Sequence, residues 1–262
     1  MLKAVKWFML VMPIIVLFYY ENGLDLHQVF VVQAVYSVTI VVLEIPSGYI
    51  ADIFGRKKTL FIGSIFGFLG YVIYCLSDHF HEFMIAEIVL GIGHSFISGA
   101  DSAMLYDTLY SNDKKNEYTK FEGRVSSIGN FSEGTAGVLG GLMALISLRT
   151  PFYIQTIILF LAIPASLLLV EPEKHEFKGK PTITQFLKNI KYAFEHRLLF
   201  LYLLLSSITG TATLTFAWFV QPYFKSIDVP LKFYGILWTL LNLSVGIMSI
   251  LSYKFEKQVG RK

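Results

Sequence analysis

Cysteine and charged residues are scarce in this 262-residue sequence. The single cysteine, Cys75, excludes an internal disulfide and a zinc site built from cysteines. Charged residues make up 16% of the chain, against about 25% in a typical soluble domain, and hydrophobic residues make up 54%. The net charge of +3 is small and indicates no nucleic-acid partner. The composition is therefore not that of a soluble domain.

Motifs for catalysis and cofactor binding are also missing. The sequence contains no His-Glu-x-x-His zinc motif, no glycine-rich phosphate loop and no pairing of a nucleophile with a base. Its glycines fall within apolar stretches instead. We therefore predict neither an enzyme nor a protein that holds a metal ion or an organic cofactor.

The apolar residues gather in runs of about 20, the length that a helix needs to cross a bilayer, and the mean hydropathy is +0.57. The first run follows Lys3 and Lys6, as in a signal peptide. The bulky sequence FYYENGLD after it offers no small-residue cleavage site, so we interpret the run as a retained span. We predict an all-α integral membrane protein with eight spans, at residues 4–20, 29–51, 59–77, 83–106, 125–147, 151–170, 198–221 and 233–252.

The positive charges predict an orientation. If the N-terminus is cytoplasmic, all but three of the 22 lysines and arginines fall in cytoplasmic segments, the exceptions being Arg149, Lys225 and Lys232. This asymmetry indicates a multi-pass protein of the cell (inner) membrane, with the lipid bilayer as its surroundings. Aromatic residues near the span ends are expected to lie mostly at the membrane interface; they include Trp7, Phe18, Tyr19, Tyr20, Trp218 and Tyr223.

One long connection divides the chain into three predicted parts. Residues 1–170 hold six spans, 171–197 form a cytoplasmic linker, and 198–262 hold two further spans. From Thr182 onward the linker carries apolar residues at helical spacing, which predicts an amphipathic helix lying on the inner membrane surface.

The turn after the second span concentrates charge and glycine in the stretch EIPSGYIADIFGRKKTL (Glu44 to Leu60). It fits the pattern Gly-x-x-x-Asp-x-x-Gly-Arg-Lys-x-x-Leu, with Gly48, Asp52, Gly55, Arg56, Lys57 and Leu60 at the fixed positions. Gly48 permits a close helix approach, and Gly55 permits a tight turn. Asp52 is an anion at a helix end, where it can pair with a cation or with another helix's N-terminus.

This stretch resembles the signature loop of the major facilitator superfamily. The resemblance implies a secondary transporter, typically with twelve helices in two six-helix halves around a central site. It also implies that the loop holds the two halves together on the cytoplasmic side, so that Asp52 and Arg56 act as gate residues. On this view the chain is the N-terminal two-thirds of such a bundle. About four spans are then expected from a full-length chain or a partner.

A second resemblance lies in the fifth span. Gly137, Gly140 and Gly141 fall at small-residue positions of a glycine-rich pattern found in drug–proton antiporters of the superfamily, although Gly137 stands where those proteins often have proline. We expect the three glycines to pack helices closely. Ordinary small-residue packing with no link to antiport remains the alternative.

Ionisable residues inside predicted spans are candidates for proton or substrate binding. In the fourth span Glu87, His94 and Asp101 share one helical face with Gly91 and Ser98. That face either lines an aqueous cavity or forms a hydrogen-bonded seam against a neighbouring helix. Glu87 also stands where many of these exporters have arginine. The remaining candidates are Glu44, which is eight residues before Asp52, and Glu133, whose span otherwise indicates packing.

Together these features predict secondary active transport of a small organic molecule by alternating access, with proton-coupled efflux favoured and protons as the second partner. The alternatives are a nutrient or sugar importer of the same superfamily, a membrane receptor or sensor that does not transport, and a truncated remnant.

Overall fold

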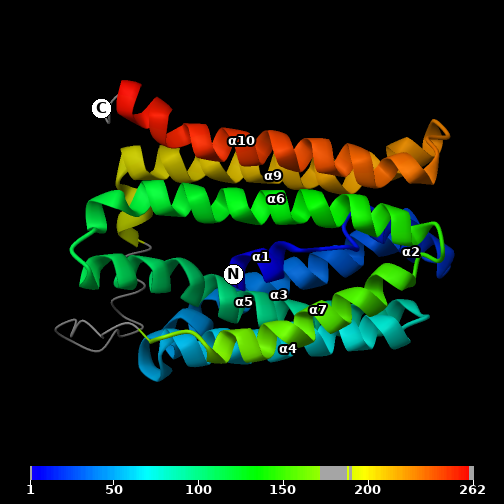
Figure 1. Ribbon diagram of the computed structural model, residues 1–262, viewed down its shortest axis with the longest axis horizontal. Coiled ribbons are helices and arrows are strands. Elements are labelled where there is room, and N and C mark those ends of the chain that lie inside the picture. The colour runs from blue at the N-terminus through cyan, green and yellow to red at the C-terminus, as the bar shows by residue number, and fades with distance from the viewer. Residues whose placement is uncertain (1, 172–187, 189–190, 260–262) are drawn as a thin grey trace. The chain divides into compact units, whose positions relative to one another are not determined.

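The computed structural model describes residues 2–171, 188 and 191–259 (Figure 1). Every regular element in this part of the chain is a helix. The α-helices are α1 (Leu2–Trp7), α2 (Ile15–Glu21), α3 (Leu26–Phe54), α4 (Arg56–Leu76), α5 (Phe80–Ser111), α6 (Tyr118–Ala144), α7 (Thr150–Leu167), α9 (Arg197–Ser226) and α10 (Tyr234–Val259). Two short 3-10 helices, η1 (Lys115–Glu117) and η2 (Leu231–Phe233), precede α6 and α10.

Two compact units make up the chain. The first joins Met1–Glu173 to Val229–Lys262 and contains α1 to α7 and α10. The second, Lys174–Asp228, contains α9, a helix of 30 residues. The predicted division into residues 1–170, 171–197 and 198–262 stays a prediction.

Six of the described helical segments are long and apolar enough to cross a membrane, namely α3, α4, α5, α7, α9 and Leu231–Leu251, which contains η2 and most of α10. The expected all-helical membrane architecture is thus confirmed. The count of eight spans stays a prediction. The 27-residue helix α6 is long enough for a fifth span, but glycine and polar side chains dilute its apolar surface. Residues 182–187, 189 and 190 of the amphipathic linker helix expected from Thr182 lie outside the described residues.

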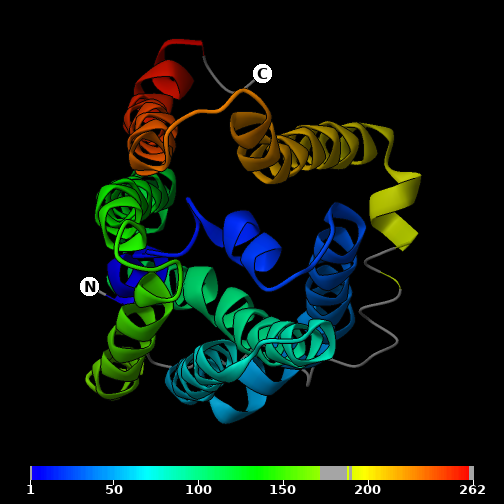
Figure 2. The same cartoon turned by 90° about the vertical axis from the view of Figure 1, so that its right-hand side faces the viewer.

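The first predicted span is not one continuous helix. α1 ends at Trp7 and α2 begins at Ile15, and the residues between them form turns. Pro13 lacks an amide hydrogen and disfavours helical backbone in the residue before it, which accounts locally for the break. The expectation of a helix over 4–20 was therefore wrong. Non-helical backbone at membrane depth is tolerated where protein surrounds it, and in the end-on view of Figure 2 α2 lies between α3 and α6.

Contacts with α6 and α7 hold the interrupted segment in place. The amide of Leu10 donates to Oε1 of the fully buried Gln155 in α7, at 2.8 Å. On the α6 side, a Cβ atom on Gly140 would lie only 1.9 Å from the carbonyl oxygen of Leu10. Backbone thus packs directly on backbone, and glycine is the residue that leaves room for it.

Arg149 joins the C-terminal end of α4 to the N-terminal end of α7. As the residue before α7, it donates through Nη1 to the Cys75 carbonyl at 3.2 Å and through Nη2 to the Ser77 carbonyl at 3.1 Å, both at the C-terminal end of α4. Nη2 also contacts Asn22 Oδ1 and an Asp78 carboxylate oxygen. A cation beside the last carbonyls of a helix is stabilising, because that end carries partial negative charge.

We expect Gly140→Ala to destabilise the protein strongly, because the added methyl group would overlap the Leu10 carbonyl. Overpacking in a dense core costs about 1–3 kcal/mol, and backbone that cannot rotate away favours the upper end. The matched control is Gly67→Ala in α4, where an added Cβ meets no atom within 4 Å. Thermal unfolding of both variants in the same detergent is the measurement, and equal melting temperatures would contradict the packing of Leu10 on α6.

Candidate functional site

The predicted polar face of α5 lies against α3 along much of its length. A Cβ atom on Gly91 would lie 2.8 Å from Cβ of Thr39, and one on Gly99 would lie 3.3 Å from Cα of Gly48. A Cβ on Gly48 itself would meet nothing within 4 Å, so Gly99 rather than Gly48 limits this approach. The two helices are parallel, and polar side chains of α3 and α5 meet at several levels between them.

At the first level the Glu87 carboxyl group is buried, with only 4% of the residue exposed. Its Oε1 accepts hydrogen bonds from Tyr19 Oη at 3.1 Å, from Gln33 Nε2 at 3.1 Å and from Tyr74 Oη. Gln33 Nε2 also lies 3.1 Å from Tyr19 Oη, and the two tyrosine hydroxyls contact each other. We call these four residues the Glu87 network; they come from α2, α3, α4 and α5.

Aromatic rings enclose this network. The Phe18 ring lies 4.2 Å from that of Phe152 and 5.7 Å from that of Phe83, measured between centroids. Tyr74 is 5.4 Å from Phe152 and 5.6 Å from Phe83. In the described part of the chain, Glu87 has no ion-pair partner. A carboxylate buried in this way depends on its hydrogen-bond donors, because an isolated charge is very costly to move out of water.

Sequence reasoning identified Glu87 but missed its three partners. Phe18 and Tyr19 are fully buried in the bundle, so they are exceptions to the expectation that most aromatic residues near the span ends lie at the membrane interface. An available signal was Gln33, a polar residue in the otherwise apolar stretch VFVVQAVY. The tyrosines gave no such signal, because their rings suit a membrane interface and a bundle interior equally well.

Toward the C-terminal ends of α3 and α5 the polar groups of the seam are more exposed. The Tyr36 hydroxyl lies 2.9 Å from His94 Nδ1, and Ser98 Oγ donates to Glu44 Oε1 at 2.8 Å. Glu87 thus lies in a buried hydrogen-bonded seam, whereas His94, Ser98 and Glu44 are exposed, and the aqueous cavity at this face stays a prediction. Asp101 follows on the same helix and is half-buried.

Glu133 lies at the contact between α6 and α10. Its Oε1 accepts a hydrogen bond from Trp238 Nε1 at 3.2 Å. The helices approach closely here: a Cβ on Gly137 would lie 3.3 Å from the Gly235 carbonyl oxygen, and one on Gly141 would lie 2.9 Å from Gly235 Cα. The three glycines singled out in the sequence thus face two partners, Gly137 and Gly141 meeting α10 and Gly140 meeting the turn before α2.

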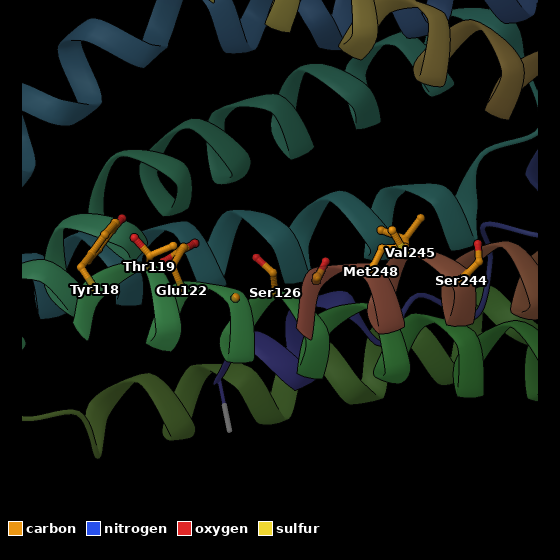
Figure 3. Close-up of a pocket in the computed structure, with 9 residues that line it drawn as sticks. Tyr118, Thr119, Glu122, Ser126, Ser244, Val245 and Met248 are labelled. Carbon is orange, nitrogen blue, oxygen red and sulfur yellow. The ribbon is translucent and has the colours of Figure 1, made fainter. Parts of the chain in front are cut away.

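A groove of about 590 Å³ runs between α6 and α10 (Figure 3). It combines one carboxyl group, several hydroxyl groups and apolar side chains, a mixture that can contact a small organic molecule. Its lining residues are Tyr118, Thr119, Glu122, Gly123, Ser126, Ser244, Val245, Met248 and Ser249.

The signature turn between α3 and α4 forms a cluster of charges. Arg56 Nη2 lies 2.7 Å from Asp52 Oδ1, and Arg56 Nε lies 3.4 Å from Asp107 Oδ2 at the end of α5. We call Asp52, Arg56 and Asp107 the Arg56 cluster. Gly55, at the turn, has a φ of 102°, a conformation that favours glycine. Lys57 follows in the first turn of α4, and its amide, like that of Arg56, donates to the Glu171 carboxylate.

Comparison with known proteins adds independent information. The sequence profile described as Major Facilitator Superfamily matches residues 5–262. The chain is 24% identical over 171 residues to "Quinolone resistance protein NorA" of Staphylococcus aureus (strain COL), which covers 65% of this chain and 43% of that protein. It is 22% identical over 163 residues to "Multidrug resistance protein 2" of Bacillus subtilis (strain 168), covering 60% and 40%. The matches span about two-fifths of the length of these relatives.

We expect Tyr74→Phe to lower stability by about 1–3 kcal/mol, because it removes one donor from a buried carboxyl group. The control is Tyr71→Phe, on the same helix, whose ring lies 5.9 Å from that of Tyr74 and does not belong to the Glu87 network. Melting temperatures in one detergent give the comparison. An equal loss in both variants would mean that the hydrogen bond from Tyr74 to Glu87 contributes no more than any other tyrosine hydroxyl in this part of α4.

Proposed function

Because the chain belongs to the major facilitator superfamily, we propose that it acts in secondary active transport, exporting a small organic molecule in exchange for protons. The family match agrees with the resemblance carried by the signature turn. Members of this family are transporters rather than enzymes. Alternating access, in which a central site opens to each side of the membrane in turn, is the proposed mechanism.

The direction of transport rests on the relatives. Two proteins that share 22–24% identity with this chain are named for resistance to quinolones or to multiple drugs. Resistance of that kind fits export. We infer that this chain binds small organic molecules and moves them out of the cell. In this proposal it is a multi-pass protein of the cell membrane with its N-terminus in the cytoplasm.

The proposal of proton coupling rests on one observation. Glu87 is buried in a network formed by four helices, and no lysine or arginine among the described residues forms an ion pair with it. In its ionised form the carboxylate accepts hydrogen bonds from the surrounding donors. In its protonated form it donates one hydrogen bond and no longer carries a charge that is costly to bury. Proton binding therefore changes the relative free energies of closed and water-accessible states, which is what coupling requires.

The other ionisable groups are secondary candidates in this proposal. Glu44 and His94 are exposed on the seam, and Asp101 is half-buried there. They can pass protons or contact substrate. Glu133 contacts Trp238 across the α6–α10 interface, so its charge can respond to movement of α10.

We assign the Arg56 cluster to the inner gate. Its two ion pairs join the inner ends of α3, α4 and α5. Asp52 keeps 42% of its side chain exposed, so it remains available to a further helix. The cluster is therefore suited to keeping the cytoplasmic side of the transporter closed. Its ion pairs join helices and do not form a substrate pocket.

Export is tested by expressing the protein in bacterial cells that lack their own drug exporters and by following a fluorescent quinolone. We expect lower accumulation than in cells with empty vector, and we expect a protonophore to abolish the difference because the gradient drives export. The same cells are then challenged with a panel of chemically diverse dyes. Unchanged accumulation of every compound, with the protein present in the membrane, would refute export.

Glu87→Gln is expected to reduce proton-driven export at least tenfold, because the amide keeps the shape of the network but cannot exchange a proton. Binding of the exported compound should change little. The matched control is Glu21→Gln, the same substitution at an exposed position at the end of α2. Proton release on substrate binding, measured with a pH dye on purified protein, gives a second readout. Full export by Glu87→Gln would transfer the coupling role to another acid.

A further inference from the structure

The carboxyl group of Glu171 caps the N-terminus of α4. Its Oε1 accepts a hydrogen bond from the Arg56 amide at 2.6 Å, and its Oε2 accepts one from the Lys57 amide at 2.7 Å. These are the first two amides of the helix, which have no carbonyl partner within it. An anion at this end also complements the partial positive charge of the helix dipole. Glu171 thus supplies from a distant part of the chain what a local capping residue usually supplies.

Gly55 makes this contact possible. A Cβ atom at Gly55 would lie 2.8 Å from Glu171 Oε1, inside the space that the carboxylate occupies. The turn also bonds to the helix that it begins, since Thr59 Oγ1 donates to the Gly55 carbonyl at 2.8 Å. The glycine of the signature turn therefore has two reasons to be glycine: its positive φ and the carboxylate beside it.

The path of the chain after α7 brings Glu171 to this position. Leu169 packs against a small buried cluster formed by Ala51, Leu60 and Ala100, which belong to α3, α4 and α5. Glu171 follows two residues later, where the predicted linker begins. The end of α7 is thereby anchored to the inner ends of three other helices.

Both ends of α4 consequently receive a charge of the favourable sign from the flanks of α7. Arg149, before α7, donates to the last carbonyls of α4, and Glu171, after α7, accepts from its first amides. Side chains on either side of α7 thus fix the position of α4 along its own axis. The first turn of α4 also carries Arg56, whose side chain reaches Asp52 and Asp107.

We propose that Glu171 is a positioning residue of the inner gate, which holds the first turn of α4 so that Arg56 can pair with Asp52 and Asp107 together. Loss of the Glu171 carboxylate would release the cap and loosen both ion pairs. This proposal rests on the gate function proposed above for the Arg56 cluster. It adds a residue outside the signature turn to that gate.

Amide hydrogen exchange on the full chain in lipid nanodiscs tests the contact without requiring transport. We expect Glu171→Gln to speed exchange at Arg56 and Lys57 roughly three- to tenfold, because the side chain keeps one acceptor oxygen in place of two. Glu171→Asp should recover part of the protection, since it keeps the charge. The control is Asp113→Asn, which neutralises an exposed acid in the turn after α5. Unchanged exchange in Glu171→Gln would refute the cap.

Export kinetics test the positioning role. We expect Glu171→Gln to lower the maximal export rate about threefold or more per molecule of folded protein, with the half-saturating substrate concentration unchanged, because the gate and not the substrate site is altered. Glu171→Asp should regain part of the rate. Faster exchange with normal export would overturn the gate role and leave a purely structural cap. An altered half-saturating concentration would also overturn it, since Glu171 would then act at the substrate site. If the unmodified protein exports nothing, the proposed function itself fails.

Discussion

The burial of the Glu87 carboxyl group is the constraint on which much of the first unit depends. Inside a bilayer no water is at hand, so the protein must supply every hydrogen bond that a buried polar group makes. Here α2, α3 and α4 each contribute one donor to a carboxyl group on α5. Aromatic rings fill the surrounding space. Four helices are thereby fixed relative to one another around a group that can also change its charge.

A second constraint is the close contact of backbones at α6. Glycines on different faces of this helix admit the turn before α2 on one side and α10 on the other. Membrane helices gain little from the hydrophobic effect against each other, so close packing and hydrogen bonds carry much of their association. The position of Glu133 beside Trp238 follows from this contact. The interface between α6 and α10 therefore contains both close glycine packing and a titratable group, Glu133.

Charges at the signature turn act through helix ends as well as through ion pairs. The first turn of α4 is where these interactions meet. Its first two amides donate to Glu171, and its Arg56 side chain pairs with Asp52 and Asp107. The sequence motif accounts for Asp52, Gly55 and Arg56, because a fixed spacing around a short turn is a local property. Asp107 and Glu171 are 51 and 115 residues away from Arg56. No local pattern connects such positions.

The helical membrane architecture, the position of the signature turn and the acids within the apolar stretches could all be predicted from the sequence, because each depends on local composition or spacing. Tertiary structure alone decided that the first span breaks, that Tyr19 turns inward and that Gln33 and Tyr74 meet Glu87. The physical reason is that lipid and the bundle interior are both apolar. A membrane helix therefore needs no amphipathic pattern to mark its buried face, and only packing between distant segments selects the residues that meet.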